Sequence, residues 1–248
     1  MRSYAVTHPR DVGLADRSYP DWDQLAFASR GVMTVTTRAG VWVVPPHRAV
    51  WIPAGEVHGV RTSGRVALRT LYLRPELGAG RLPRVCTALH VTPLVRELVL
   101  HAASRNTLRR DVAADCNLAA VIVDQLVISP LEPLQLPMPR DDRARSAATE
   151  IQDDPARPLS IVARRAGASL RTLERLFLRD TAMPLGRWRR RARLIHALKL
   201  LAEGVPVAGV ASEVGYETTS AFIAVFRREL GTTPGRYFAD GSAGAPTE

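Results

Sequence analysis

The sequence predicts a mixed fold in two parts: a small all-β barrel or sandwich carrying a pair of helices, and then an all-α region with two helix-turn-helix units. Three observations predict it. Short segments rich in Val, Thr and aromatic residues fill the chain up to about residue 85, a proline-rich stretch follows the first helices, and an internal repeat occupies the last hundred residues. Short strands at close spacing are typical of small barrels and sandwiches.

The positive charge of the chain is concentrated in one segment. The 248 residues carry a formal net charge of +10. Between Arg157 and Lys199 there are twelve basic residues against two acidic ones, so this segment alone has a net charge of +10. A localised basic patch is what a phosphate-binding surface requires. The alternative is that these arginines only form an ordinary helix face in contact with solvent.

Cysteine usage and hydropathy indicate a soluble, cytoplasmic protein. Cys86 and Cys116 form no C-x-x-C pair and no disulfide framework. No signal-like N-terminus and no apolar run of roughly 18 residues is present, so we expect no contact with a membrane.

The β region has a predicted strand for each apolar run and a turn for each cluster of Gly and Pro. Expected turns include Arg38-Ala39-Gly40, Pro53-Ala54-Gly55 and Thr62-Ser63-Gly64. The expected strands are residues 24–28, 32–37, 41–44, 49–52 and 66–72. Together they make residues 1–85 one domain.

A pair of helices follows, expected at residues 93–103 and 109–128 within a segment spanning 88–129. On the first helix Leu94, Leu98 and His101 share one face, and Val95 and Val99 lie beside it. Four prolines between 130 and 139 then exclude a helix interior, so residues 130–142 are expected to form an extended linker.

The helical region that follows repeats itself. Residues 158–177 read PLSIVARRAGASLRTLERLF, and residues 206–226 read PVAGVASEVGYETTSAFIAVF. Gly167 and Gly215 match as turn residues, for which a positive φ is cheap, and Ser169 and Thr218 match as polar helix N-caps. These features predict helix-turn-helix units at about 159–180 and 207–230, joined by a helix at 185–203.

One such unit by itself is most often a plain pair of packed helices. Two aligned copies on either side of a basic segment favour DNA binding instead. This repeat, and above all the stretch ASEVGYETTSAFIAVFRRELGTTPGRY at 211–237, resembles the DNA-binding domain of AraC/XylS-type regulators, and the resemblance covers about residues 143–240.

The resemblance implies a set of DNA contacts by position. It places base contacts at Arg171, Glu174, Arg175, Thr219, Ser220 and Ala224, and we expect phosphate contacts at Arg179, Arg189, Arg190 and Arg227. Arg171 and Arg175 lie one helical turn apart and can each reach a guanine edge, worth about 1–3 kcal/mol per good pair. Glu174 suits a cytosine, or equally an ion pair with those arginines. The short side chains of the second helix predict mainly phosphate and shape contacts there.

The N-terminal half contains GVMTVTTRAGVWVVPPHRAVWIPAGEVH at 31–58, which resembles the cupin-like sensor domain of AraC-type regulators over about residues 15–75. Relatives use the following helices as a dimer contact; packing onto the barrel is the competing use. A sensor implies a small apolar or aromatic effector, for which the candidate pocket residues are Trp42, Trp51, His58 and Tyr72, unless these rings only fill the core.

Metal-dependent cupins carry a His-x-His pair that residues 18–24 lack. His58 remains, His47 lies in another turn, and Cys86 with His90 is more simply a buried thiol beside a helix-start histidine. We therefore expect no metal, no cofactor and no catalytic residue.

The sequence thus predicts a one-component transcription regulator rather than an enzyme. Its expected partners are double-stranded promoter DNA, a small-molecule effector, a second copy of the chain and, for an activator, RNA polymerase. Two alternatives stay open: a cupin-type metalloenzyme with a helical accessory domain, and a DNA-binding protein without sequence preference.

Overall fold

The computed structural model describes residues 1–9, 12–38, 40–78, 80–127 and 134–239. Two compact units divide this chain: the first extends to Leu134 and the second begins at Gln135. Pro130 and Pro133 of the predicted linker lie outside the described residues. None of the helices in the described ranges is both long enough and apolar enough to cross a bilayer.

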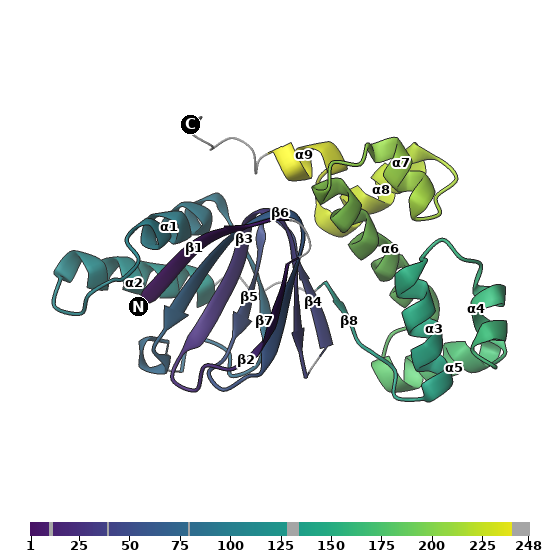
Figure 1. The fold of residues 1–248 in the computed structure, drawn as a ribbon, viewed down its shortest axis with the longest axis horizontal. Coiled ribbons are helices and arrows are strands. Elements are labelled where there is room, and N and C mark those ends of the chain that lie inside the picture. The colour runs from purple at the N-terminus through teal and green to yellow at the C-terminus, as the bar shows by residue number, and fades with distance from the viewer. Residues whose placement is uncertain (10–11, 39, 79, 128–133, 240–248) are drawn as a thin grey trace. The chain divides into compact units, whose positions relative to one another are not determined.

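The first unit is an antiparallel sheet (Figure 1). Its strands are β1 (Arg2–His8), β2 (Gly13–Arg17), β3 (Asp23–Thr37), β4 (Gly40–Val44), β5 (Arg48–Ile52), β6 (His58–Leu73) and β7 (Thr87–His90). The long strands β3 and β6 pair with each other along their whole length. The first half of β3 also pairs with β5 and its second half with β4, while β6 pairs first with β2 and then with β1. The described strands do not close into a barrel.

Two glycines bend the central pair of strands, and at one of them, Gly64, a turn was expected. Gly31 and Gly64 have φ values of +79° and +74°, and the register of β3 against β6 shifts on both sides of Arg30. A Cβ on Gly31 would lie 2.6 Å from the carbonyl oxygen of Arg65. The prediction of a turn at Thr62-Ser63-Gly64 is therefore wrong: the strand continues, because a glycine at positive φ makes a bulge inside a strand as readily as a turn.

Alternation along the strands creates two apolar cores in the first unit. Ala26 and Ala28 of β3 belong to the core between the two halves of the bent sheet, together with Met33 and Trp42. Leu25 and Phe27 face the opposite way and pack beneath the helices. The period of two in strand side chains thus separates neighbouring residues into different environments.

The helices that cover the second of these cores are α1 (Pro93–Ser104) and α2 (Ala113–Val127), after the short 3₁₀ helix η1 (Pro75–Leu77). Thr92 caps α1 by accepting from the backbone N–H of Val95 at 3.2 Å. Val95 and Val99 are buried, whereas Leu94 is 53% exposed. The second helix begins at Ala113 and not at Arg109. The carboxylate of Asp115, in the first turn of this helix, accepts from the backbone N–H of Arg109 at 2.8 Å, and Arg109 lies in the loop before the helix.

The second unit opens with the two-residue strand β8 (Gln135–Leu136) and is otherwise helical. Its helices are α3 (Asp142–Asp153), α4 (Leu159–Arg165), α5 (Leu170–Thr181), α6 (Leu185–Ala202), α7 (Val207–Glu213), α8 (Thr219–Leu230) and α9 (Pro234–Ala239). Within this unit α6 runs between α3–α5 at one end and α7–α9 at the other (Figure 1). Phe177 packs on Trp188 of α6, and Phe226 packs on Tyr237 of α9.

Candidate nucleic-acid interface

The first helix-turn-helix unit consists of α4 and α5. Gly167 makes the turn with φ +64°, and the Ser169 hydroxyl accepts from the backbone N–H of Thr172 at 3.1 Å, so Ser169 is the N-cap of α5. Leu173 and Phe177 are fully buried on the inner face of the helix. The outer face is left to polar residues.

The second unit consists of α7 and α8 and uses the same local rules. Gly215 turns the chain with φ +78°, and the Thr218 hydroxyl caps α8 by accepting from the backbone N–H of Ala221 at 3.1 Å. Phe222 and Phe226 are buried and stack edge to face with ring centroids 5.7 Å apart. Gly231 ends the helix at φ +80°.

The predicted base contacts of α5 gather at one groove. Arg171, Glu174 and Arg175 are exposed, and they line an open cavity of about 580 Å³ that α5 shares with Pro184 and Leu185 at the start of α6. Among the described residues, none of the three side chains makes an ion pair. The alternative that Glu174 pairs with its arginine neighbours is therefore absent from this structure, and all three side chains face solvent.

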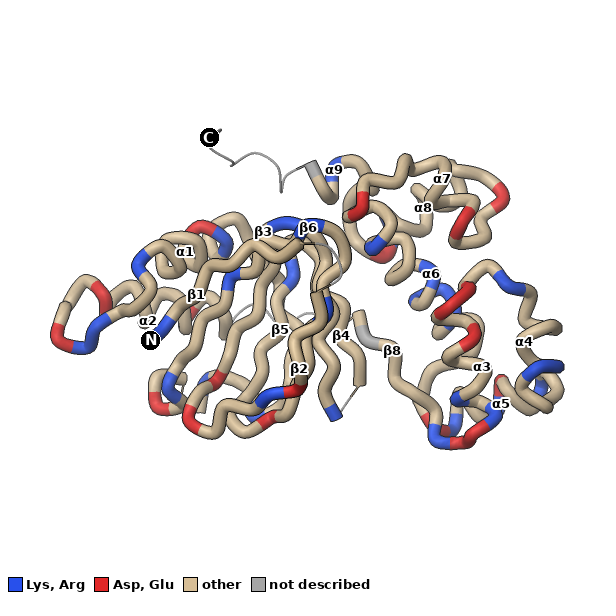
Figure 2. The backbone as a smooth tube through the Cα atoms, in the orientation of Figure 1, with Lys and Arg blue, Asp and Glu red and all other residues tan. Residues whose placement is uncertain are grey.

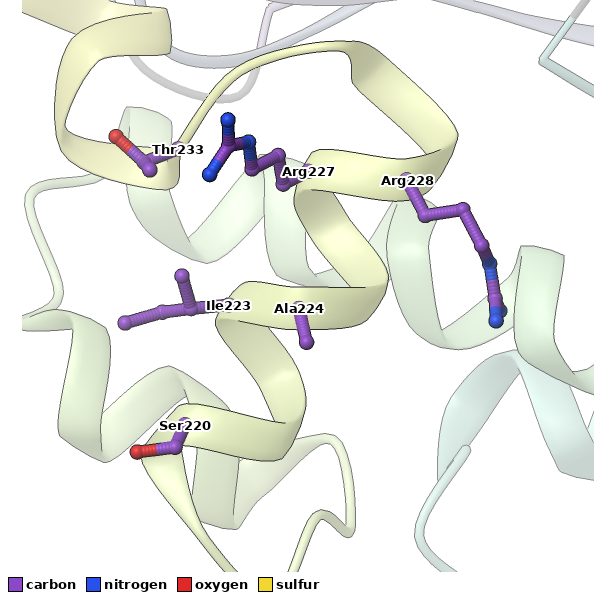
Figure 3. A pocket seen from close by; sticks show the side chains of 6 residues that line it. All are labelled: Ser220, Ile223, Ala224, Arg227, Arg228 and Thr233. Carbon is purple, nitrogen blue, oxygen red and sulfur yellow. The ribbon is translucent and has the colours of Figure 1, made fainter.

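Ser220 and Ala224, two of the three predicted base contacts of α8, line a second open groove of about 660 Å³ with Ile223, Arg227, Arg228 and Thr233. Ser220 and Ala224 are exposed, and Thr219 is half-buried beside the N-cap. Figure 3 shows Ser220 and Arg227 on the same side of α8 as Ile223, with Arg227 reaching toward Thr233, while Arg228 extends the other way. This groove offers two hydroxyl groups, a methyl group and two guanidinium groups to a ligand, and the guanidinium of Arg228 also pairs with Glu229 at 3.4 Å.

The four predicted phosphate contacts have three different environments. Arg190 and Arg227 are exposed. The Nε atom of Arg179 donates to the Oδ1 atom of Asp180 at 2.6 Å, although its side chain is 54% exposed. Arg189 is half-buried and directs its guanidinium into the protein, toward the carbonyl oxygen atoms of Pro155, Ala156 and Arg157. Burial, and then the neighbouring Arg193, lowers the pKa of Arg189.

The basic residues follow α4, α5 and α6 in the second unit (Figure 2). Some of them are neutralised: the carboxylate of Glu150 on α3 accepts from Arg157 and, at 2.9 Å, from Arg165. The Oδ2 atom of Asp180 accepts from the backbone N–H groups of Arg140 and Asp141 at 2.9 and 3.0 Å, and Arg179 and these bonds hold the pKa of Asp180 well below its usual range. These ion pairs join α3 to the first helix-turn-helix unit.

The four residues predicted to line an effector pocket do not come together in the structure. Trp51 lies in the core beneath the helices and donates to the carbonyl oxygen of Pro83 at 2.9 Å. Trp42 lies in the other core and donates to the Thr37 hydroxyl at 3.2 Å. His58 is buried, with its Nδ1 atom 3.0 Å from the carbonyl oxygen of Glu56. Tyr72 borders an open cavity.

That cavity, of about 350 Å³, lies over β1, β2 and the second half of β6, and of its lining residues only Tyr72 was predicted from the sequence. Its lining residues are Arg2, Tyr4, Val6, His8, Leu14, Arg17, Tyr19, Trp22, Leu68, Thr70 and Tyr72. The rings of Tyr19 and Tyr72 are 4.9 Å apart, and burial, followed by the Tyr19 hydroxyl, raises the pKa of Tyr72. The signal in the sequence was the alternation Arg2-Tyr4-Val6-His8, which puts four side chains on one face of a strand.

Across the described ranges, no three His, Cys, Asp or Glu residues are grouped as a metal ion needs. Burial, and then Glu56, raises the pKa of Cys86 to about 12, so that its sulfur stays a protonated thiol. His90 and His47 lie near each other, and burial, and then His47, lowers the pKa of His90.

Comparison with known proteins agrees with this arrangement. Residues 15–111 match the AraC-like ligand binding domain, and residues 162–240 match a helix-turn-helix domain. The HTH-type transcriptional regulator NimR of Escherichia coli (strain K12) is 36% identical over 218 residues, which are 87% of this chain and 79% of NimR. The regulator RipA of Corynebacterium glutamicum is 36% identical over 116 residues, 44% of this chain and 35% of RipA.

Among solved structures, the crystal structure of unsaturated fatty acid bound ToxT from Vibrio cholerae strain SCE256 aligns with 99% of this chain and 97% of its own, at 10% identity and a TM-score of 0.40. NimR is similar over most of both chains, and the two domain matches come in the same order as the two units. The protein therefore belongs to the AraC-type family of HTH-type transcriptional regulators, with an N-terminal ligand-binding domain and a C-terminal DNA-binding domain.

Proposed function

We propose that this regulator reads its operator mainly through α5, with Arg171 and Arg175 on guanine edges and Glu174 on a cytosine. The observation that carries the proposal is the exposure of these three side chains on one groove, without ion pairs to other described residues. They lie in the first half of the second helix of a helix-turn-helix unit, the part that enters the major groove. An uncompensated guanidinium is free to make two bonds to O6 and N7 of guanine.

The helix α8 has the smaller share of base reading in this proposal. Thr219 and Ser220 offer short hydroxyl groups, and Ala224 offers a methyl group for a thymine contact. Arg227 contacts a phosphate, as do Arg190 on α6 and Arg179 when it leaves Asp180. Phosphate contacts fix the register of a protein on DNA without reading its sequence.

The experiment is selection of operator sequences with the full chain from random DNA, followed by titration of the variants on the selected site. Arg171→Ala and Arg175→Ala are each expected to weaken binding by about 1–3 kcal/mol and to relax the preference at one base position. Arg84→Ala removes the same charge from an exposed position in the first unit and serves as the control. Recovery of no preferred sequence would instead favour the non-specific DNA-binding protein.

The ligand of the N-terminal domain is proposed to bind the cavity over β1, β2 and β6. Its aromatic lining suits an aromatic or apolar body. None of the described lining residues is acidic, and neither Arg2 nor Arg17 makes an ion pair with a described carboxylate, which suits a ligand with an acidic group. Occupation of the site then biases the arrangement of the DNA-reading unit by a population shift.

Titration with phenylacetate tests this site, with phenethylamine as the cationic molecule of similar shape. Trp22 lines the cavity, so phenylacetate is expected to change its fluorescence, and Trp22→Phe to remove the change. Arg17→Ala is expected to weaken phenylacetate binding. Equal responses to the two probes would contradict an acidic ligand, and a response unaffected by Trp22→Phe would contradict this location.

The assembly is proposed to be a homodimer formed through α1 and α2. Their buried faces pack on the sheet, while Leu94 and Val121 remain 53% and 42% exposed and free for a second copy. If the protein activates its promoter, the DNA-bound dimer also contacts RNA polymerase. Transcription in vitro from the selected operator, with and without the protein, gives the direction of the effect.

A further inference from the structure

A loop between α3 and α4 connects parts of the DNA-binding unit that are far apart in the sequence. The loop is Pro155–Arg157, and it directly precedes the first helix-turn-helix unit. Its shape is fixed locally, because the Oδ1 atom of Asp154 accepts from the backbone N–H groups of Ala156 and Arg157 at 3.2 and 3.1 Å. The Arg157 side chain returns to Asp154 Oδ2 at 3.1 Å and to Glu150.

Two arginines of α6 bind the carbonyl groups of this loop. Arg189 donates from Nε to Pro155 at 3.2 Å, and from Nη2 to Ala156 at 2.9 Å and to Arg157 at 2.6 Å. Arg193, one helical turn later, donates from Nε to Pro155 at 3.1 Å. Charge-assisted bonds from a planar guanidinium have a defined direction, so the loop is held to α6 in one orientation.

The turn of the second helix-turn-helix unit rests on the same loop. A Cβ on Gly215 would lie 2.9 Å from the Cα atom of Ala156 and 2.8 Å from Nη2 of Arg193. The Arg193 guanidinium also stacks over the ring of Tyr216, 5.4 Å from its centroid. The equivalent glycine of the first unit, Gly167, has no described heavy atom of this kind within 4 Å of a Cβ position. The close approach is therefore specific to the second unit.

From these contacts we infer that Arg189 and Arg193 are positioning residues, which fix the second helix-turn-helix unit relative to the first by clamping both units to the loop Pro155–Arg157. By itself, the helix α6 would set the separation of the two units but not their rotation about its axis. The loop adds a second point of attachment. Rotation of the first unit about α6 would break the charge-assisted bonds from Arg189 and Arg193 to the loop, and rotation of the second unit would separate Gly215 from Ala156 and Tyr216 from Arg193. The separation and angle between α5 and α8, and with them the spacing of the two DNA segments, are then fixed before DNA is bound.

The first test measures distances without DNA. Spin labels are placed on α4 and α7 through Arg164→Cys and Glu213→Cys, both exposed positions, in the full chain carrying Cys86→Ala and Cys116→Ser. A narrow distance distribution is expected, and the double variant Arg189→Ala, Arg193→Ala is expected to broaden it. Arg190→Ala removes the same charge from the exposed side of α6 and should leave it narrow. An unchanged distribution in the double variant would overturn the inference.

The second test uses the operator selected with the parent protein, and it rests on the proposed function. The double variant is expected to lose about tenfold in affinity for the whole operator, because two linked contacts are no longer presented together, while its affinity for either half alone is unchanged. One base pair inserted between the halves should weaken the parent protein more than the double variant. Equal weakening of half and whole sites would mean that the arginines act on folding or charge, not on position.

The distance measurement does not depend on the proposed function. If selection returns no preferred sequence, the proposed function is lost, yet the distance distributions still decide whether the loop sets the geometry. Arg189→Lys distinguishes position from charge: a lysine keeps the charge but cannot direct bonds to three carbonyl groups. Combined with Arg193→Ala, it should therefore broaden the distance distribution as Arg189→Ala does, and a distribution as narrow as that of the parent protein would contradict the directional clamp.

Discussion

Phe177 of α5 and Trp188 of α6 pack edge to face, with their ring centroids 5.2 Å apart. Both side chains are fully buried, and the indole N–H of Trp188 donates to the carbonyl oxygen of Pro137 at 2.9 Å. This one contact attaches the proposed reading helix to the central helix of the unit and to the chain that enters it.

Trp188→Ala is expected to lower the free energy of unfolding of the DNA-binding unit by about 3–5 kcal/mol, because the cavity cannot be filled by small movements. Trp188→Phe keeps the ring contact and leaves the Pro137 carbonyl without its donor, for a loss of about 1–3 kcal/mol. Urea unfolding followed by far-UV circular dichroism measures both. If Trp188→Ala lowered the free energy of unfolding by less than Trp188→Phe does, this account of the core would be contradicted.

Asp180 makes the stability of the same unit depend on pH. Its pKa is lowered in the folded state, chiefly by Arg179 and the backbone N–H of Asp141. The stability that it contributes is therefore fully present above the unfolded value of about 3.9 and is lost as pH falls through the folded value. Asp180→Asn should be less stable than the parent protein at pH 6, and the difference should shrink below about pH 4.

The urea midpoint at several pH values tests this dependence. Asp142→Asn is the control, because that carboxylate is almost fully exposed and pairs only at the surface with Arg145. A stability difference for Asp180→Asn that stays constant from pH 6 to pH 3 would show that the carboxylate charge is not the cause.

Arg189 and Arg190 are neighbours in the sequence, but only the substitution of Arg190 is expected to change the salt dependence of DNA binding. Arg190 is exposed, so Arg190→Ala should weaken binding about equally for all sequences and reduce the slope of log K against log salt by about 1. The guanidinium of Arg189 already donates to carbonyl groups of the protein, so Arg189→Ala should leave that slope unchanged. Titrations at several salt concentrations decide it; a reduced slope for Arg189→Ala would restore it as a phosphate contact.

Leu94→Glu is expected to convert the proposed dimer into a monomer, because closing the interface would bury the new carboxylate without a partner. Leu94 is exposed in the single chain, so the fold of the first unit should not change. Light scattering after gel filtration measures the assembly. Val57→Glu makes the same chemical change outside the helices and should remain a dimer. An intact dimer in Leu94→Glu would move the interface elsewhere.

Local rules account for the parts of the molecule that the sequence predicted. Glycine at positive φ and a hydroxyl at the N-cap are determined within four residues, so Gly167, Ser169, Gly215 and Thr218 were readable from the repeat. The same rules gave the inward faces of α5 and α8, whose apolar residues recur at three and four positions. The resemblance to AraC-type regulators was carried above all by the stretch at 211–237, and the relatives show that the chain belongs to this family.

Non-local contacts account for the rest. The turn predicted at Gly64 is a bulge because β3 pairs along the whole of β6, a partner some thirty residues away in the chain. Trp42 pairs with Val35 and Trp51 pairs with Leu25, and these two residues of β3 belong to different cores because the register shifts between them, so proximity in the sequence could not make the two tryptophans neighbours in a pocket. The cavity beside Tyr72 needs β1, which pairs with β6 more than fifty residues later.

By itself the sequence determined the class of this protein, because charge, repeat and capping are properties of short segments. Only the tertiary structure decided which acceptors the arginines of the basic segment reach. Arg171 and Arg175 face solvent, whereas Arg189 and Arg193 bind the loop Pro155–Arg157, and all four look alike in the chain. The physical reason is that the role of a guanidinium depends on the acceptors near it. Carbonyl groups more than thirty residues away are brought to Arg189 and Arg193 only when the helices pack.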